Sequence, residues 1–228
     1  MSAGTTVAIA LLLCAVVAAG AGLWLKQQQI VQREAFQALA ARRGWSLTIS
    51  EQKLGRPAIL RLTARSGSGW HGESRLDAGD EQGARSYLTT VFSADEPHWS
   101  EGCVVLIPGP ITGLSAPDPA TLPQGRSLQS LATRANLALS AGLQAQLRSF
   151  PAPPGLSVQA TVDPVQRFDL DALAKVMTAW TPQQRSNDGQ PVIQIGPEGF
   201  RVQVGHGMRR ADEMEQFIDF ALQVIRVI

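Results

Sequence analysis

Three histidines, His71, His98 and His206, are the side chains best suited to acid–base or metal chemistry. None of them stands at a spacing typical of a metal site with another histidine, a cysteine or a carboxylate. The triplet His71-Gly72-Glu73 has the H-x-E form, but the paired cysteines of a zinc deaminase are missing. We therefore predict structural or surface roles for the histidines, and no metal or cofactor.

Other reactive patterns are incomplete. Gly109 to Gly113 is rich in glycine, but no Gly-Lys-Ser/Thr follows it, so it is not a phosphate loop. Gly67-Ser68-Gly69 lacks the strand–turn–helix context of a nucleophile elbow. Cys103 begins the apolar run to Ile107 and is the one cysteine of the predicted soluble part, so we expect a buried thiol. The sequence therefore favours a protein that is not an enzyme. An enzyme of unidentified class ranks third, after the two binding or structural roles described below.

The N-terminal segment indicates where the protein lies. Thr5 to Leu25 is an almost unbroken apolar run of 21 residues, and Lys26 is the first charged side chain. As a helix this run would be about 31 Å long, close to the hydrocarbon thickness of a bilayer. Trp24 and Lys26 then fit the membrane interface. A cleaved signal peptide ending at Ala19-Gly20-Ala21 is the alternative, but its N-terminal region lacks a positive charge.

The charges that flank this predicted span give its orientation. Lys26, Arg33, Arg42 and Arg43 follow it, and no lysine or arginine precedes it. Because positive flanks stay in the cytoplasm, we expect a single-pass protein of the bacterial inner membrane with a cytoplasmic domain. A periplasmic domain is the alternative.

Small residues share one side of the predicted span and could let a second helix approach closely. The alternative is a chain that is generally rich in alanine. These candidate contacts are Ala15, Ala18, Ala19 and Gly22.

The fold class follows from the rest of the chain. Segments 45–49 and 58–64 alternate apolar and polar residues as strands do, and Gly196-Pro197-Glu198-Gly199 suits a β-hairpin turn. Asp169 can cap a helix that starts after it, and Asp212-x-x-Glu215 resembles a capping box for a last helix. We predict an α+β fold, with an antiparallel sheet packed against about three helices and preceded by one transmembrane helix.

The predicted organisation has three parts. Residues 1–25 are the transmembrane anchor, residues 26–44 a helical stalk with Ile30, Val31, Ala35, Leu39 and Ala40 as its apolar stripe, and residues 45–228 the α+β domain. Within the domain, we expect a proline-rich loop at 108–125 and a helix at 127–150.

Two further features suggest contact with a partner. The apolar arc of the last helix is wider than a one-sided surface helix needs, and Phe220, Val224 and Val227 widen it. Either this helix is sandwiched within its own fold or it offers a second face to a partner. Trp99 lies in a polar stretch and either anchors an interface or folds back onto the sheet.

The formal net charge of +1 and the absence of a basic stripe exclude nucleic acid as an expected partner. We expect contacts with membrane lipid and with other membrane protein subunits or a second copy. The leading hypothesis is an accessory or scaffolding subunit of a bacterial membrane complex. The alternative is a membrane-tethered domain that binds a small molecule or peptide.

Overall fold

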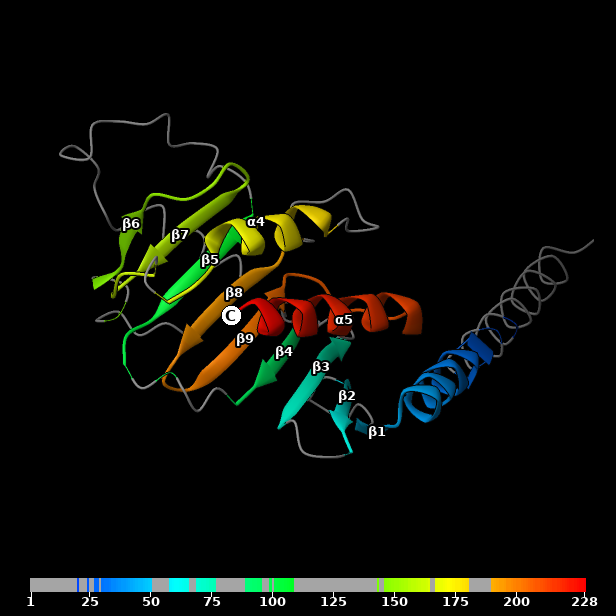
Figure 1. Ribbon diagram of the computed structural model, residues 1–228. Coiled ribbons are helices and arrows are strands. Elements are labelled where there is room, and N and C mark those ends of the chain that lie inside the picture. Colours follow the sequence, from blue (N-terminus) through cyan, green and yellow to red (C-terminus); the bar gives the residue numbers. More distant parts are fainter. Residues whose placement is uncertain are drawn as a thin grey trace, which may run out of the picture.

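The computed structural model describes residues 30–50, 58–65, 69–76, 89–95, 101–108, 146–164, 167–180 and 190–228, together with residues 20, 24, 27, 28, 99 and 143. Its centre is a nine-stranded antiparallel sheet with the strand order β1-β2-β3-β4-β9-β8-β5-β7-β6 (Figure 1). The strands are β1 (Trp45–Ser50), β2 (Ala58–Ala64), β3 (Trp70–Leu76), β4 (Thr90–Ala94), β5 (Val104–Pro108), β6 (Arg148–Phe150), β7 (Leu156–Ala160), β8 (Val192–Gly196) and β9 (Gly199–Val204).

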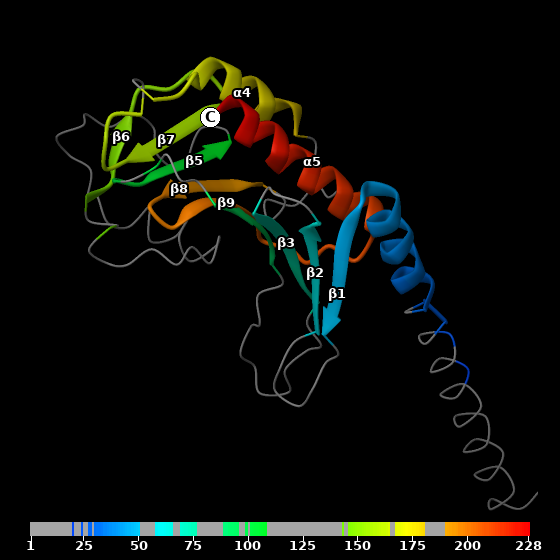
Figure 2. The same cartoon turned by 60° about the horizontal axis from the view of Figure 1, so that its bottom comes forward.

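Three helices cover one face of this sheet (Figure 2). They are the N-terminal helix (residues 30–43), α4 (Leu170–Ala179) and α5 (Ala211–Val227). Helix α5 lies between the other two, with α4 over the β5–β7 side of the sheet and the N-terminal helix at the β1 side (Figure 2). The predicted α+β class, a large antiparallel sheet with three helices, is confirmed.

Local signals explain where the helices start and stop. The N-terminal helix ends at residue 43, and Gly44 follows it with a φ of 67°, a conformation that glycine adopts at little cost. The carboxylate of Asp169 accepts a hydrogen bond of 2.9 Å from the backbone N–H of Ala172, which confirms it as the cap of α4.

The helix-covered face carries the main core. Aromatic rings form a chain across the sheet from β1 to β9. The ring centroids of Trp45 and Trp70 are 5.3 Å apart, those of Trp70 and Phe92 are 5.4 Å apart, and those of Phe92 and Phe200 are 6.2 Å apart. Successive side chains of a strand point to opposite faces of the sheet, which separates apolar from polar residues. In β2, for example, Leu60 and Leu62 are buried while Arg61 between them is exposed. All three helices therefore pack on this apolar face of the sheet.

The opposite face has a smaller apolar cluster, centred on β5. Cys103, Val105 and Ile107 are buried there together with Leu147 and Val192. Since the alternate residues Val104 and Leu106 belong to the main core, β5 is buried on both faces. This explains why its sequence is an unbroken apolar run.

The predicted helix 127–150, the predicted loop 108–125 and the predicted membrane span are described by the structure only in part. Residues 148–150, the end of the helix predicted at 127–150, form strand β6 instead, while Leu143 is helical and most of the predicted helix lies outside the described residues. The predicted loop 108–125 also lies outside them, apart from its first residue. Among the residues that the structure describes, no helix is both long and apolar enough to cross a membrane. Of the predicted span, only Gly20 and Trp24 are described, and both are helical.

Candidate functional site

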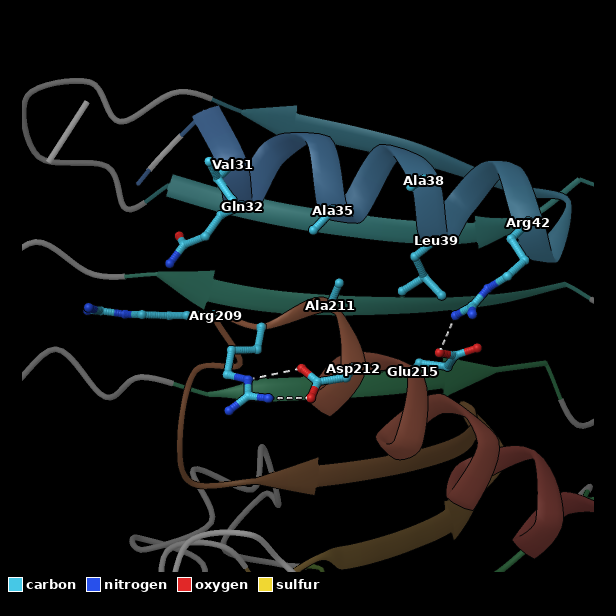
Figure 3. A pocket seen from close by; sticks show the side chains of 11 residues that line it. Val31, Gln32, Ala35, Ala38, Leu39, Arg42, Arg209, Ala211, Asp212 and Glu215 are labelled. Atoms are coloured by element: carbon cyan, nitrogen blue, oxygen red, sulfur yellow. Dashed lines mark hydrogen bonds and ion pairs between the residues drawn. The ribbon is translucent and has the colours of Figure 1, made fainter. Parts of the chain in front are cut away.

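A groove of about 520 Å³ runs between the N-terminal helix and the start of α5 (Figure 3). One wall is the N-terminal helix, and the other is the segment that leads into α5 and its first turn. The residues that line it are Val31, Gln32, Ala35, Ala38, Leu39, Arg42, Arg209, Arg210, Ala211, Asp212 and Glu215. Five of these residues are alanine or aliphatic, five are charged, and Gln32 is a polar amide.

The first wall is fixed because the N-terminal helix is part of the domain core. Phe36, Leu39 and Ala40 are 2%, 3% and 5% exposed and belong to the same cluster as the sheet residues. Ile30 and Val31, which the sequence analysis placed on the same apolar stripe, are instead 55% and 63% exposed. The prediction of a single apolar stripe was wrong in this respect. The helix has apolar residues on two separate sides, and only one of these sides faces the sheet.

Ion pairs join the end of the N-terminal helix to α5. The Arg42 guanidinium lies 2.6 Å from one carboxylate oxygen of Glu215, and Nε of Arg43 lies 3.1 Å from the other. Arg43 also pairs with Asp219 and covers the ring of Trp45, 5.0 Å from its centroid. Glu215 therefore holds another helix rather than closing a capping box, and α5 begins at Ala211 without a side-chain cap.

The second wall is held by buried hydroxyl groups. The backbone N–H of Met208 donates to the hydroxyl oxygen of Ser74 on β3 at 2.8 Å, and the Ser74 hydroxyl lies 3.2 Å from the Met208 carbonyl oxygen. The Thr90 hydroxyl on β4 lies 2.9 Å from the carbonyl oxygen of His206. Because these groups are shielded from water, breaking one bond would leave a costly unpaired polar atom. The segment that carries Arg209 is therefore anchored to the sheet.

Charges at this wall are distributed unevenly. Arg210 binds Asp212 through two bonds, 3.0 Å from Nε and 2.5 Å from a terminal nitrogen, and the hydrogen bond to Arg210 lowers the pKa of Asp212. Arg209 is exposed, forms no ion pair with any described residue, and points toward the end of the groove where Val31 and Gln32 lie (Figure 3). Among the described residues that line the groove, Arg209 is thus a cation without an ion pair, and it lies at the end of the groove nearer the predicted span.

A second and smaller groove, of about 300 Å³, lies between α4 and α5. Trp180, at the end of α4, packs against Phe220 with ring centroids 4.8 Å apart and against Phe217 at 6.2 Å. Phe220 and Val224 are buried, and Val227 is partly buried against the core. Contact between these residues and a partner would require this packing to open. The partner contact itself stays a prediction.

Trp99 is also inside the fold. It is 6% exposed, its indole N–H donates to the Gly102 carbonyl oxygen at 2.9 Å, and its ring stacks on Phe168 with centroids 5.2 Å apart. The guanidinium of Arg167 lies over the same ring, 4.8 Å from its centroid. A partner contact by Trp99 remains a prediction, and the structure accounts for its burial by these contacts. Of the predicted membrane-interface pair, Trp24 is 58% exposed, and Lys26 lies outside the described residues.

A polar row crosses the sheet on the face opposite the helices. Glu73 on β3 lies between Arg61, 2.6 Å away, and Arg75, 3.2 Å away. Burial alone would raise the pKa of Glu73, but hydrogen bonds and charge from the two arginines outweigh it, so the pKa is lowered. Further along, Gln194 on β8 is paired in register with Arg201 on β9. Burial lowers the pKa of Arg201, and Nε of Arg201 and Oε1 of Gln194 are shielded without a hydrogen-bond partner among the described residues.

The residues singled out for chemistry are scattered. His71 is half-buried on β3, His206 follows β9, and His98 lies outside the described residues. Cys103 is buried, and burial together with the charge of Glu198 raises the pKa of its thiol to about 11, so it is protonated at neutral pH. Within the described part of the chain, no three histidine, cysteine or carboxylate side chains gather as metal ligands would.

The groove was not predicted from the sequence. The signal that could have found it is a spacing of alternately four and three residues in Trp24, Gln28, Val31, Ala35 and Ala38. The other wall could not have been found in this way, because Arg209 approaches residue 31 only through the tertiary fold.

Comparisons with known proteins add little. No protein family matches the chain, and no curated protein matches it. A solved structure with some likeness is the crystal structure of the mycobacterial trehalose monomycolate transport factor A, TtfA, which is 12% identical. The TM-score is 0.39 over 86% of this chain and 96% of that chain, so the likeness assigns neither a fold family nor an activity to this protein.

Proposed function

We propose that this chain is a single-pass, membrane-anchored accessory subunit of a bacterial membrane complex, with its domain in the cytoplasm. The observation that supports this proposal best is the burial of Phe36, Leu39 and Ala40 in the domain core. A helix that follows a predicted span directly and is also part of the domain would hold that domain at a fixed height and angle above the bilayer. Such a rigid connection suits a subunit that positions partners.

The groove supports the same proposal. It begins at Val31, which is six residues after the predicted span, or about 9 Å along a helix axis. The large apolar side chains that the described structure exposes, Trp24, Ile30 and Val31, lie at this end of the molecule. Exposed apolar groups concentrated beside a membrane are suited to contact with lipid or with another membrane protein.

The test is extraction of the tagged full chain from its own membranes. We expect the chain to stay with the membrane after an alkaline carbonate wash and to migrate in mild detergent as a complex that contains other polypeptides. A variant without residues 1–25 should leave the membrane fraction and lose that complex. Release by carbonate, or migration without any other polypeptide, would contradict the proposal.

The proposed orientation needs a separate measurement. Gln190 is exposed, so an engineered cysteine there, with Cys14 replaced by serine, reports the side of the membrane. A thiol reagent that cannot cross the membrane should label Gln190→Cys only after the cells are opened. Labelling in intact cells would place the domain in the periplasm.

A second candidate function, the binding of a small polar molecule or peptide, is favoured by the pair Gln194 and Arg201. An arginine N–H and an amide oxygen, both shielded and unpartnered within the described residues, could together bind a group that both accepts and donates a hydrogen bond, such as an amide, once the cover over them opens. Thermal melts of the full chain with amino acids and short peptides would test it. A ligand that raises the melting temperature of the wild type but not of Gln194→Leu would support this function.

A further inference from the structure

An exposed stripe runs along the N-terminal helix, and the described residues Trp24 and Gln28 before that helix continue its spacing. Within the helix, Val31, Ala35 and Ala38 of this stripe line the groove. Trp24, Gln28, Val31, Ala35 and Ala38 follow one another at intervals of four and three residues, and all five are exposed. This is the spacing of the positions that meet a second helix in a coiled coil. The buried side of the same helix, with Phe36, Leu39 and Ala40, is a different one.

The composition of the stripe suits close packing between two helices. Ala35 and Ala38 let two backbones approach, while Val31 and Trp24 supply apolar area toward the membrane end. Two polar side chains share the spacing: Gln28, and Arg42 four residues after Ala38, which is paired with Glu215 of its own chain. An amide such as Gln28 at this kind of position favours a paired helix with the same amide in register. These features fit an identical helix that runs in the same direction.

We propose that the stripe is a parallel dimer interface, in which the N-terminal helix of a second copy lies along it and against the groove. The proposal rests on the proposed function, because two copies that are inserted into one membrane in the same orientation necessarily present parallel helices. It goes further by naming a second copy as the partner at this surface.

Charge supplies the argument for a second copy. On the N-terminal helix, Gln32 and Leu39 flank the stripe on the side of α5, and Glu34 flanks it on the other side. In a parallel pair, opposite flanks of the two helices face each other. Glu34 of the partner subunit would therefore lie on the α5 side of the first helix, where Arg209 points (Figure 3).

Both of these charged groups are available. Glu34 and Arg209 are exposed, and neither forms an ion pair with a described residue. The neighbouring charges on this wall, Arg210 and Asp212, already bind each other. The two-fold symmetry of a dimer would form the pair between Glu34 and Arg209 twice, once on each side of the stripe.

The first test is disulfide formation in membranes that contain the full chain with Cys14→Ser. Single cysteines are placed at Val31, Ala35 and Ala38, and the matched controls are at Ile30, Gln37 and Ala41, which are also exposed but lie off the stripe. Copper-catalysed oxidation should give covalent dimers at the three stripe positions and few at the controls. Equal cross-linking at both sets, or linkage to a polypeptide of another mass, would overturn the proposal.

The second test is a charge exchange, read as the dimer fraction of the full chain in mild detergent. Glu34→Arg and Arg209→Glu should each weaken association about fivefold, and the double variant should restore it. Arg226→Glu makes the same charge change at the far end of α5 and should have no effect. A double variant as weak as either single variant would contradict the predicted pair.

The two proposals can fail separately. A dimer that contains no other polypeptide would keep this inference and remove the accessory-subunit role. A complex that contains other polypeptides but only one copy of this chain would support the accessory-subunit role and overturn the dimer interface.

Discussion

Helix α5 has α4 on one side and the N-terminal helix on the other, and the two contacts differ in kind (Figure 2). Toward α4 the contact is aromatic, with Trp180 against Phe217 and Phe220. Toward the N-terminal helix the contact includes partly exposed ion pairs, which Glu215 and Asp219 form with Arg42 and Arg43. Apolar burial contributes far more to stability than exposed ion pairs do. We therefore expect the ion pairs with the N-terminal helix to orient α5, while packing of its apolar residues against the core supplies most of its stability. The groove of about 520 Å³ lies on the side of α5 that carries these ion pairs.

The largest expected effect tests the aromatic side. Phe217 is fully buried, so Phe217→Ala should lower the free energy of unfolding by about 3–5 kcal/mol through lost burial and an unfilled cavity. Denaturant unfolding of the full chain in detergent, followed by circular dichroism, measures this change. A loss below about 1 kcal/mol would show that the α4–α5 contact is not part of the core.

A smaller effect is expected where Met214 and Ile218 of α5 lie against Gly72 of the sheet. A Cβ added at Gly72 on β3 would lie 3.0 Å from the terminal methyl carbon of Met214 and 3.2 Å from Cδ1 of Ile218. Gly72→Ala should therefore overpack this contact and cost about 1–3 kcal/mol, while Met214→Ala in the same chain should relieve part of that strain. Thermal melts of the single and double variants would show the coupling, and simple additivity would refute it.

The charged side should be much less sensitive. Glu215→Gln removes the ion-pair partner of Arg42 and one of the two partners of Arg43, which keeps Asp219. Because Arg42 is also largely exposed, we expect a loss of about 1 kcal/mol or less in the free energy of unfolding. Raising the salt concentration should reduce the difference from wild type, because salt screens exposed charges. A loss as large as that of Phe217→Ala would mean that the two sides of α5 do not differ as described.

The smallest effect concerns the polar face of the sheet and depends on pH. Because the pKa of Glu73 in the folded protein is lowered from 4.5, its ionised form stabilises the fold above about pH 4.5, and this contribution is lost as the pH falls through the folded pKa. Arg61 and Arg75 are half exposed, so the effect should stay below about 1 kcal/mol. Unfolding curves between pH 3 and pH 6 should show a steeper acid loss for wild type than for Glu73→Gln. Parallel curves would show that the Glu73 carboxylate does not contribute to the loss of stability in acid.

Local patterns allowed much of the fold to be predicted. The alternation in β2, the turn that contains Pro197 and the cap at Asp169 each depend on a few neighbouring residues, and all three match the structure in kind. The β8–β9 hairpin was found because its pairing is local, whereas the neighbours β4 and β9 are joined by more than a hundred residues of chain.

The predictions that failed depend on distant parts of the chain. Glu215 looked like part of a capping box, but Arg42 and Arg43 bind it across more than 170 residues of sequence. Phe150 fell on the apolar face of the predicted helix 127–150, but residues 148–150 pair with β7 as a strand. The groove needs residues 31–42 beside residues 209–215, which only the tertiary fold provides.

The central claim is that the N-terminal helix belongs to the domain and holds the groove beside the predicted span. Hydrogen exchange of the full chain in lipid nanodiscs tests it most directly. We predict that the amides of residues 36–43 exchange as slowly as those in the first turns of α5, and that Phe36→Ser removes this protection while α4 stays protected. Exchange of residues 36–43 in wild type as fast as in an unstructured linker would contradict the claim.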